Sequence, residues 1–396
     1  MTELLRKTLG QVLSETAARF PDRSAVKYTD RDYERTYGQF DDECGRLARG
    51  FLKLGYRKGD HIAVWATNTP EWLMTLFAAA KIGVVLVTVN TNYTIFELEY
   101  QLKQCDAKGL LLIDGVKDGS YVDIVNQLIP EVSKSRGIIH APKFPFIKHV
   151  FYAGKQAEPP KGMIGFSELL KPENLSSVAL FDKINATLDP DDVINMQYTS
   201  GTTGFPKGVM LTHYNLVNNG KSIGDCMNLT EKDRYCICVL FFHCFGLVLS
   251  IFASVTHGSS MVPIDHYRPT SVMAAITDEK CTAVNGVPTM FIAMLEHPDF
   301  EKYDFSTLRT GIMAGSPCPV KSMQDVVDKM NMKEITIVFG QTESAPGCTQ
   351  TTVNDSLERR VSTVGRTLPH VEAKIVDPES GATLPPNTTG EFCARG

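Results

Sequence analysis

The chain has 396 residues, of which 43% are hydrophobic and 21% charged, and its formal net charge is −5. This length exceeds what one simple core covers, so it predicts two or three packed subdomains. No run of Lys or Arg is longer than the pair Arg359 and Arg360, which argues against nucleic-acid binding. Ten cysteines without a secretory signal favour reduced thiols and a cytoplasmic location.

Helix and strand patterns alternate over the first third of the chain. Apolar residues recur at helical spacing around residues 9–20 and 40–54. Short, nearly continuous apolar runs predict strands at 61–65, 84–89 and 109–113, with helices at 71–82 and 95–104 between them. Apolar strands separated by helices indicate parallel strands that are covered on both faces.

The alternation returns after a less regular stretch at residues 114–170. Further strands are predicted at 193–198, 209–212, 283–286, 309–313 and 335–339, and helices at 271–279 and 288–295. After Pro346, short strands at 373–376 and 390–394 indicate a smaller β-rich piece. The predicted fold class is α/β, with two doubly wound, mainly parallel β-sheet subdomains flanked by helices (about 1–190 and 191–345) and a smaller C-terminal β-rich subdomain (about 346–396).

Residues 236–255 raise two possibilities, a metal site and a membrane span. Cys236, Cys238, His243 and Cys244 lie close in sequence, but the second cysteine pair of a zinc site is missing. Cysteines in an apolar stretch usually behave as small hydrophobic residues. The apolar run 239–255 has 17 residues, the short limit for crossing a bilayer, and contains polar side chains. We therefore expect a buried helix that follows a strand, and no transmembrane segment.

A segment rich in hydroxyls and glycines follows the predicted strand at 193–198. It contains Thr199, Ser200, Gly201, Thr202, Thr203, Gly204, Phe205, Pro206, Lys207 and Gly208. Glycines allow the backbone to approach an anion, amides and hydroxyls donate to phosphate oxygens, and the lysine adds positive charge. The alternative is an ordinary surface turn. A Walker A loop is excluded because proline precedes the lysine, and no Rossmann fingerprint is present. A polyphosphate is the expected ligand.

This segment, from Tyr198 to His213, resembles the signature of the adenylate-forming (AMP-binding) superfamily. Further resemblances follow in the family's order over nearly the whole chain. They are Pro70 to Trp72, Val89 to Tyr93, Phe242 and His243, Ala314 to Pro317, Phe339 to Glu343, Val364 to Arg366, and Gly390 and Glu391. The segments Gly286 to Thr289 and Val364 to His370 are most similar to the medium-chain fatty acyl-CoA synthetase branch. The resemblance implies an acid–thiol ligase that uses ATP, Mg²⁺ and CoA as co-substrate.

The resemblance also implies a nucleotide site. Lys207 and the hydroxyl-rich segment would bind the phosphates, Thr342 would donate to the α-phosphate, and Glu343 with Ser200 would bind the metal. The adenine ring would lie among Gly315, Ser316, Pro317, Phe339, Gly340 and Gln341. The position of Glu343 after an apolar strand supports this role, because ligands bind at the carboxyl ends of parallel strands. The alternative is an ordinary solvated glutamate.

The acyl group would lie beside this site. By resemblance, His243 would lie between the acyl carboxylate and the phosphate, although a lone histidine in an apolar run is more often a satisfied core residue. The implied catalytic residues are Lys207, His243, Thr342 and Glu343, and the acyl-binding candidates are His243, Phe245, Gly246, Val287 and Gly315. These motifs contain no charge to match a charged acyl tail or an α-amino group. A medium- to long-chain fatty acid is therefore favoured.

The sequence is also compatible with three further functions. An adenylation module that loads a carrier protein and an aryl-CoA ligase are two of them, and a non-catalytic nucleotide-binding module is the third. Members of the family continue to a ribose-binding Asp, a hinge and a small domain with a catalytic Lys, which this sequence lacks. We therefore expect an AMP-binding N-terminal domain over 1–396, poorly active alone. Its partners would be fatty acid, ATP and CoA, and a homodimer is left open.

Overall fold

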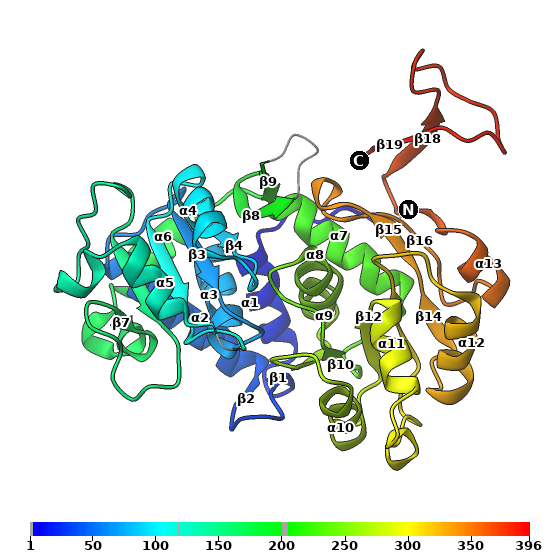
Figure 1. Cartoon of the computed structure of the whole chain (residues 1–396), viewed down its shortest axis with the longest axis horizontal. Helices are drawn as coiled ribbons and strands as arrows, with labels where there is room; N and C mark the ends of the chain where they lie inside the picture. Colours follow the sequence, from blue (N-terminus) through cyan, green and yellow to red (C-terminus); the bar gives the residue numbers. More distant parts are fainter. Residues whose placement is uncertain (1–2, 118, 200–204) are drawn as a thin grey trace.

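The computed structural model describes residues 3–117, 119–199 and 205–396. Two seven-stranded, mainly parallel sheets with flanking helices form most of the molecule (Figure 1). A three-stranded and a two-stranded antiparallel sheet follow near the C-terminal end. The α/β prediction with two mainly parallel sheets and a smaller β-rich part is therefore confirmed.

The first sheet has the strand order β7-β6-β5-β3-β4-β8-β9. Its strands are β3 (His61–Trp65), β4 (Val85–Thr88), β5 (Gly109–Leu112), β6 (His149–Tyr152), β7 (Ile164–Gly165), β8 (Val193–Thr199) and β9 (Lys207–Thr212). All neighbouring strands are parallel except β8 and β9, which form an antiparallel hairpin. The central strands are buried on both faces, as their uninterrupted apolar sequences predict.

The second sheet has the order β14-β13-β12-β10-β11-β1-β2. Its strands are β1 (Ser24–Lys27), β2 (Glu34–Thr36), β10 (Arg234–Ile237), β11 (Ser260–Pro263), β12 (Ala283–Gly286), β13 (Thr310–Met313) and β14 (Glu334–Thr336). Only the β1–β2 pair is antiparallel among the strands described for this sheet. Each sheet therefore has one antiparallel strand at one of its edges.

The two sheets exchange segments across the boundary that the sequence places near residue 190. Strands β1 and β2, from the first 40 residues, extend the second sheet beside β11. Strands β8 and β9, beyond residue 190, extend the first sheet beside β4. A domain boundary at residue 190 thus does not separate the two sheets, because each sheet contains strands from both sides of that residue.

Helices cover the faces of both sheets (Figure 1). The α-helices are α1 (Leu9–Arg19), α2 (Tyr37–Lys53), α3 (Pro70–Ala80), α4 (Ile95–Gln104), α5 (Tyr121–Leu128), α6 (Val178–Asn185), α7 (His213–Cys226), α8 (Cys244–Gly246), α9 (Ala253–His257), α10 (Pro269–Glu279), α11 (Pro288–Leu295), α12 (Val320–Lys329) and α13 (Leu357–Ser362). Short 3₁₀ turns are η1 (Val132–Lys134), η2 (Phe166–Leu170), η3 (Pro172–Asn174), η5 (Phe300–Lys302) and η6 (Thr342–Ser344).

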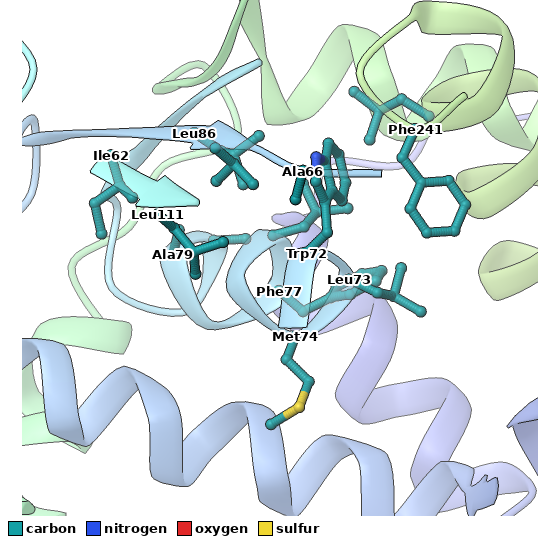
Figure 2. Close-up of a cluster of buried hydrophobic side chains, with 14 of the residues drawn as sticks. Ile62, Ala66, Trp72, Leu73, Met74, Phe77, Ala79, Leu86, Leu111 and Phe241 are labelled. Carbon is teal, nitrogen blue, oxygen red and sulfur yellow. The ribbon is translucent and has the colours of Figure 1, made fainter. Parts of the chain in front are cut away.

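We call the part of the molecule around the first sheet its first half and the part around the second sheet its second half. Helix α3 lies deep in the first half. Thr69 caps its N-terminus by accepting from the Trp72 amide, and Pro70 occupies the first turn, where no amide partner is needed. Its sequence is apolar all round, and every residue from Trp72 to Ala80 is buried. Figure 2 shows Trp72, Leu73 and Phe77 in the cluster with side chains of the first sheet, and Phe241 of the second half beside them. This helix therefore joins the two halves through one core.

The predicted single strand at 335–339 is wrong. The segment divides into β14 and β15 (Val338–Gly340), which belong to different sheets. The break occurs at Ile337, whose amide donates to Thr351 Oγ1 at 2.9 Å and whose carbonyl accepts from the Thr351 amide at 3.0 Å. Strand β15 then pairs with β16 (Gly347–Gln350), which pairs with β17 (Arg366–Thr367). Pairing with the distant Thr351 thus overrides a locally continuous apolar pattern.

The predicted helix within residues 239–255 is buried but interrupted. Residues 238–243 form a loop, and α8, a π-helix (η4, Leu247–Phe252) and α9 follow it. Among the described helices, none is long and apolar enough to cross a membrane. The last two strands, β18 (Glu372–Val376) and β19 (Glu391–Arg395), form a hairpin that stands apart from the two large sheets in Figure 1.

Candidate active site

A cavity of about 520 Å³ lies where segments of both large sheets and of the β15–β17 sheet converge. Its lining comes from β8 and β9, from α8 and the π-helix, and from loops that follow β13 and β15. The lining residues are Thr199, Lys207, His243, Cys244, Phe245, Leu249, Ala314, Gly315, Val338, Gly340, Gln341, Thr342, Glu343 and Pro346. Thr199, Ala314 and His243 all lie at or after the carboxyl ends of parallel strands, where open α/β sheets bind ligands.

The β8–β9 hairpin brings both ends of the hydroxyl-rich segment to the cavity. Thr199 and Lys207 are partners across the two strands, so the segment begins and ends at the same place. Tyr100 of α4 supports this end of β9 by stacking on Phe205 and donating to the Pro206 carbonyl at 3.1 Å. Lys207 is exposed, and it forms no ion pair with any residue in the described ranges. Its ammonium is therefore available to an anion.

Five predicted phosphate-binding residues cannot be placed. Ser200, Gly201, Thr202, Thr203 and Gly204 lie outside the described residues, between 199 and 205. Their roles, including metal binding by Ser200, remain predictions.

The turn η6 adds a hydroxyl and a carboxylate to the lining of the cavity. Thr342 is buried and Glu343 is exposed in this turn, which follows β15. The Thr199 hydroxyl donates to Glu343 Oε1 at 3.1 Å, although 144 positions separate the two residues. The polar end of the first sheet and the turn after β15 therefore contact each other at the cavity.

His243 has a defined orientation and tautomer. It caps the N-terminus of α8, and its Nδ1 accepts from the Phe245 amide at 3.1 Å. Because Nδ1 is an acceptor, the ring proton resides on Nε2 in the neutral imidazole. Burial lowers the pKa of His243 below its usual value. The side chain thus presents a neutral donor at the cavity at neutral pH.

Cys244 lies between His243 and the η6 turn. Its Sγ is 3.6 Å from His243 Nδ1 and 3.7 Å from Thr342 Oγ1, within hydrogen-bonding range for sulfur. Burial raises the pKa of the Cys244 thiol to about 11. The thiol is therefore protonated at neutral pH and connects two polar groups of the site instead of acting as a nucleophile.

The remaining wall of the cavity is apolar. Phe245 and Leu249 belong to α8 and the π-helix, and Ala314 and Val338 face them from the loop after β13 and from β15. The π-helix is held at the Leu249 carbonyl, which accepts from Tyr235 Oη and Asn285 Nδ2, each at 3.1 Å. π-helical turns are frequent at functional sites. A polar half and an apolar half therefore share one cavity.

Several residues predicted for the site lie next to the cavity but do not line it. Ser316 and Pro317 are exposed beyond Gly315, and Val287 precedes α11. Phe339 lies between two lining residues of β15, at an irregularity in the β15–β16 register, and does not itself line the cavity; it is 41% exposed and meets Phe392 edge-on. Gly246 packs against the Leu240 carbonyl, where a Cβ atom would lie 2.3 Å from the oxygen.

Five lining residues were not assigned to the site from sequence. They are Cys244, Leu249, Ala314, Val338 and Pro346. Two of them carried a usable signal. Leu249 follows Phe245 by four positions, so a helix brings both to one face, and Val338 precedes Gly340 by two positions in a strand.

The site fits a magnesium ion that is bound together with phosphates. Glu343 provides one carboxylate at the cavity, and magnesium commonly takes one or two carboxylates plus substrate phosphates and water. No group of three His, Cys, Asp or Glu side chains suitable for a metal occurs in the part of the chain that the structure describes. Glu343 would therefore hold the ion only jointly with a bound nucleotide.

Together the two sheets and the shared cavity define an α/β protein with one cavity that is lined by both polar and apolar residues. Its class follows from comparison with known proteins. Residues 13–396 match the AMP-binding enzyme family, and the chain belongs to that family.

Named relatives are similar along the whole chain. A Bacillus subtilis protein that carries the name putative acyl-CoA synthetase YngI is 51% identical over 398 residues, covering 100% of this chain and 72% of the relative. Acyl-CoA ligase sidI of Aspergillus fumigatus is 41% identical, and the match covers 98% of this chain and 64% of the relative. Medium-chain acyl-CoA ligase ACSF2, mitochondrial, of Rattus norvegicus is 36% identical, with coverages of 100% and 65%. The chain thus spans about two thirds of the length of these relatives.

Solved structures share the fold. The anthranilate CoA ligase AuaEII in complex with anthranoyl-AMP superposes with a TM-score of 0.85 at 23% identity, covering 99% of this chain and 70% of that one. A long-chain-fatty-acid-CoA ligase (FadD1) from Archaeoglobus fulgidus gives a TM-score of 0.83 at 24% identity, with coverages of 100% and 76%. At these identities the likeness establishes the fold alone.

Proposed function

We propose that the protein is an ATP-dependent fatty acid–CoA ligase. It activates a medium- to long-chain fatty acid to the acyl-adenylate with release of pyrophosphate and then transfers the acyl group to CoA. Membership of the AMP-binding family and the names of the relatives support this class of reaction. The observation that carries the proposal is the cavity whose polar half and apolar half meet at His243 and Thr342.

The polar half suits the first step, attack of a carboxylate on the α-phosphorus of ATP. Two anions must approach each other, so the site has to supply donors and positive charge to the phosphate oxygens. Lys207 supplies a cation, while Thr342 and the Nε2–H of His243 supply donors beside it. Magnesium held at Glu343 would supply further positive charge. No general base is needed, because a fatty acid is already ionised at neutral pH.

The apolar half suits the hydrocarbon part of the acid. Phe245, Leu249, Ala314 and Val338 provide a wall without charges or donors. An alkyl chain placed there gains free energy roughly in proportion to the apolar surface removed from water. An acid with a charged tail would lose hydration without finding a partner.

The test is a panel of carboxylic acids, from acetate through octanoate and palmitate to benzoate, with purified protein, ATP and Mg²⁺. Exchange of pyrophosphate into ATP reports the adenylation step, and CoA thioester formation reports the second step. We expect both signals to be largest with a fatty acid of medium or long chain. Absence of acid-dependent exchange with every acid of the panel, in protein that binds ATP, would leave only a non-catalytic nucleotide-binding function.

The same panel distinguishes a fatty acid–CoA ligase from an aryl-CoA ligase and from an adenylation module. Preference for benzoate over every fatty acid would indicate an aryl-CoA ligase. Acid-dependent exchange without thioester formation, followed by acylation of an added carrier protein, would indicate an adenylation module. The lack of charge in the apolar wall favours the fatty acid, and the names of the relatives favour CoA as acceptor.

A further inference from the structure

Asn68 makes three hydrogen bonds between the two halves of the molecule. It lies in the loop between β3 and α3, and it is 1% exposed. Its Nδ2 donates to the carbonyls of Val239 at 2.9 Å and Ile264 at 3.0 Å, and its Oδ1 accepts from the Phe241 amide at 2.8 Å. Val239 and Ile264 follow β10 and β11 closely, so one side chain of the first half binds two strand ends of the second sheet.

Asparagine is well suited to this position. Its amide group combines two N–H donors with an acceptor oxygen, and it makes two hydrogen bonds as donor and one as acceptor. Aspartate would lack both donors, and leucine, of similar size, would lack every polar contact. Because the surroundings are buried, each backbone N–H or C=O group left without its hydrogen-bond partner would lower the stability of the fold.

The loop held by Asn68 leads directly to His243. The His243 amide donates to the Leu240 carbonyl at 3.2 Å, which closes a turn that begins between the two Asn68-bound residues, Val239 and Phe241. Gly246 packs on the other side of this turn, since a Cβ there would lie 2.3 Å from the Leu240 oxygen and 3.0 Å from the Phe241 nitrogen. The turn therefore lies between Asn68 and Gly246, with little room to shift.

Neighbouring contacts hold Asn68 itself in place. Thr67 donates to Asp265, which also accepts from Arg31 at 2.7 Å, so the loop before α3 is tied to the second half by a second contact. The rings of Trp72 and Phe241 lie 5.3 Å apart at 53°, and Figure 2 shows them side by side in the core. These contacts thus fix the loop from which the side chain of Asn68 extends.

We propose that Asn68 is a positioning residue that holds the 239–243 turn and thereby sets His243 and Cys244 in the cavity. It does not line the cavity and acts only through this turn. The contribution to catalysis rests on the function proposed above, whereas the contribution to the geometry of the turn does not. Asn68 would in this way influence a site formed by segments more than 100 positions further along the chain.

The experiment compares Asn68→Ala and Asn68→Asp with a matched control, Asn218→Ala. Asn218 is also buried and also makes three backbone hydrogen bonds, to the amide and carbonyl of Leu5 and to the Tyr214 carbonyl, but none to the 239–243 turn. Gly246→Ala serves as a second variant, which displaces the turn from its other side. Two measurements need no activity: the pKa of the His243 imidazole by NMR and the alkylation rate of Cys244 by peptide mass spectrometry.

In the Asn68 variants and in Gly246→Ala, we expect the His243 pKa to rise toward its usual value of about 6.5, because the ring becomes more hydrated. Alkylation of Cys244 should become about tenfold faster, as the turn opens more readily. Asn218→Ala should lose comparable resistance to urea but change neither measurement.

Unchanged His243 pKa and Cys244 reactivity in folded Asn68→Ala, or equal changes in Asn218→Ala, would overturn the proposal. If the Asn68 variants do not fold, Gly246→Ala decides by the same two measurements. The proposed function can fail separately: if the wild-type protein shows no acid-dependent exchange, these measurements still test the turn. If the function holds, Asn68→Ala should also lower the rate constant of exchange more than it raises the KM for ATP.

Discussion

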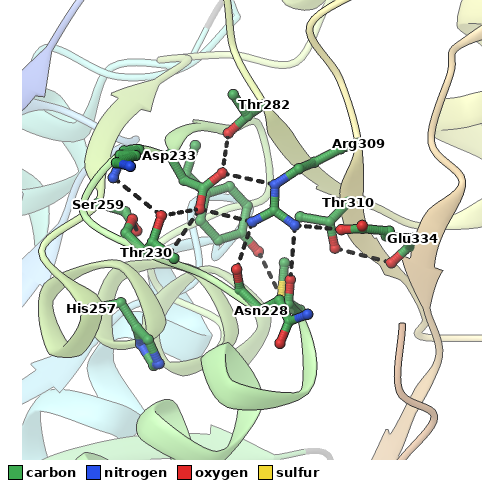
Figure 3. A network of polar contacts seen from close by, with 12 residues as sticks. Asn228, Thr230, Asp233, His257, Ser259, Thr282, Arg309, Thr310 and Glu334 are labelled. Carbon is green, nitrogen blue, oxygen red and sulfur yellow. Dashed lines mark hydrogen bonds and ion pairs between the residues drawn. The ribbon is translucent and has the colours of Figure 1, made fainter. Parts of the chain in front are cut away.

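The two ends of the second sheet use their polar residues in opposite ways. At the amino end, Asp233, Arg309 and Glu334 lie at or just before the starts of β10, β13 and β14 and bind one another (Figure 3). At the other end, His243 and Gly315 follow β10 and β13 and face a cavity that they share with Lys207 and Glu343. The same strands therefore carry a closed polar network at one end and available donors and charges at the other.

The amino-end network satisfies its own members. Arg309 donates to Asp233 at 2.8 and 3.1 Å and to the Asn228 carbonyl at 2.6 Å, and it pairs with Glu334. Asp233 also accepts from Thr282 Oγ1 at 2.6 Å and from the Thr230 amide at 2.8 Å. Burial raises the pKa of Asp233, but the hydrogen bonds from Arg309 and Thr282 outweigh burial and hold it below its usual value. Such a network stabilises the fold and offers nothing to a ligand.

The contrast teaches that polar groups at strand ends need to be judged by their partners. Charges that pair with each other indicate a structural role, whereas exposed charges around a cavity indicate a binding role. The following predictions test this division, beginning with the largest expected effect.

Arg309→Met should lower the free energy of unfolding by about 3–5 kcal/mol, because Asp233 keeps a buried charge without its partner. Urea denaturation checks this, and binding of a non-hydrolysable acyl-adenylate analogue by the folded protein should not change. The exposed pair Arg6 and Asp191 provides the control, and Arg6→Met should shift the urea midpoint little.

The depressed pKa of Asp233 adds a pH dependence with a defined sign. A carboxylate with a lowered folded-state pKa stabilises the protein above its unfolded pKa of about 3.9, and this stability is lost as the pH falls through the folded value. Arg309→Met should therefore lower the urea midpoint at pH 7. Its urea midpoint should also decrease less than that of the wild type when the pH is lowered below 4. An equal decrease of the urea midpoint in the wild type and in Arg309→Met would argue against a stabilising role of the Asp233–Arg309 pair.

Glu343→Gln should lower fatty-acid-dependent pyrophosphate exchange by about 10²–10³-fold, because the carboxylate that would hold the metal beside the phosphates is lost. The urea midpoint should stay unchanged, since Glu343 is exposed. Glu158→Gln is a suitable control, because this exposed glutamate lies between β6 and β7, at the opposite edge of the first sheet from β9. Loss of stability in Glu343→Gln without loss of exchange would reverse the assignment.

Protonation of the His243 imidazole should lower the rate of pyrophosphate exchange only below about pH 6.5. Its pKa is lowered, so the neutral ring persists at least down to its usual pKa of about 6.5, and protonation at lower pH abolishes the acceptor for the Phe245 amide. The ratio of wild-type to His243→Asn exchange rates should be constant from pH 8 to about 6.5 and fall below that. A ratio that has already fallen to about half at about pH 6.5 would mean that the ring has an ordinary pKa, and the same fall at higher pH would mean that the pKa is raised.

Thr199→Val should have the smallest effect, a loss of about three- to tenfold in affinity for the acyl-adenylate analogue. The change removes one hydrogen bond, to Glu343 at 3.1 Å, and keeps the shape of the side chain. Isothermal titration calorimetry measures the affinity. An unchanged affinity would show that Glu343 is oriented without Thr199.

Much of the fold was predictable because local apolar patterns determine its central strands. The predicted strands at 61–65 and 283–286 correspond to β3 and β12, and the apolar helix at 71–82 corresponds to α3. The errors arise where partners are distant in sequence. Strand 335–339 divides because Thr351 pairs with Ile337, and β1 joins the second sheet through the distant β11.

The motifs predicted candidate residues for a site, but they did not predict how these residues are arranged. Lys207, His243, Thr342 and Glu343 line one cavity, and their catalytic roles stay predictions. No pattern indicated that Thr199 contacts Glu343 or that Asn68 holds the turn before His243, because both contacts join segments from different sheets. Phe339 was expected at the adenine ring, and in the structure it does not line the cavity.

The most direct test of this account is a crystal structure of the protein with a non-hydrolysable fatty acyl-adenylate analogue. We predict that its phosphate mimic lies within hydrogen-bonding distance of Thr342 and near Lys207, with the alkyl chain against Phe245 and Leu249. An analogue bound elsewhere, with the cavity beside Lys207, Thr342 and Phe245 occupied only by solvent, would contradict the account.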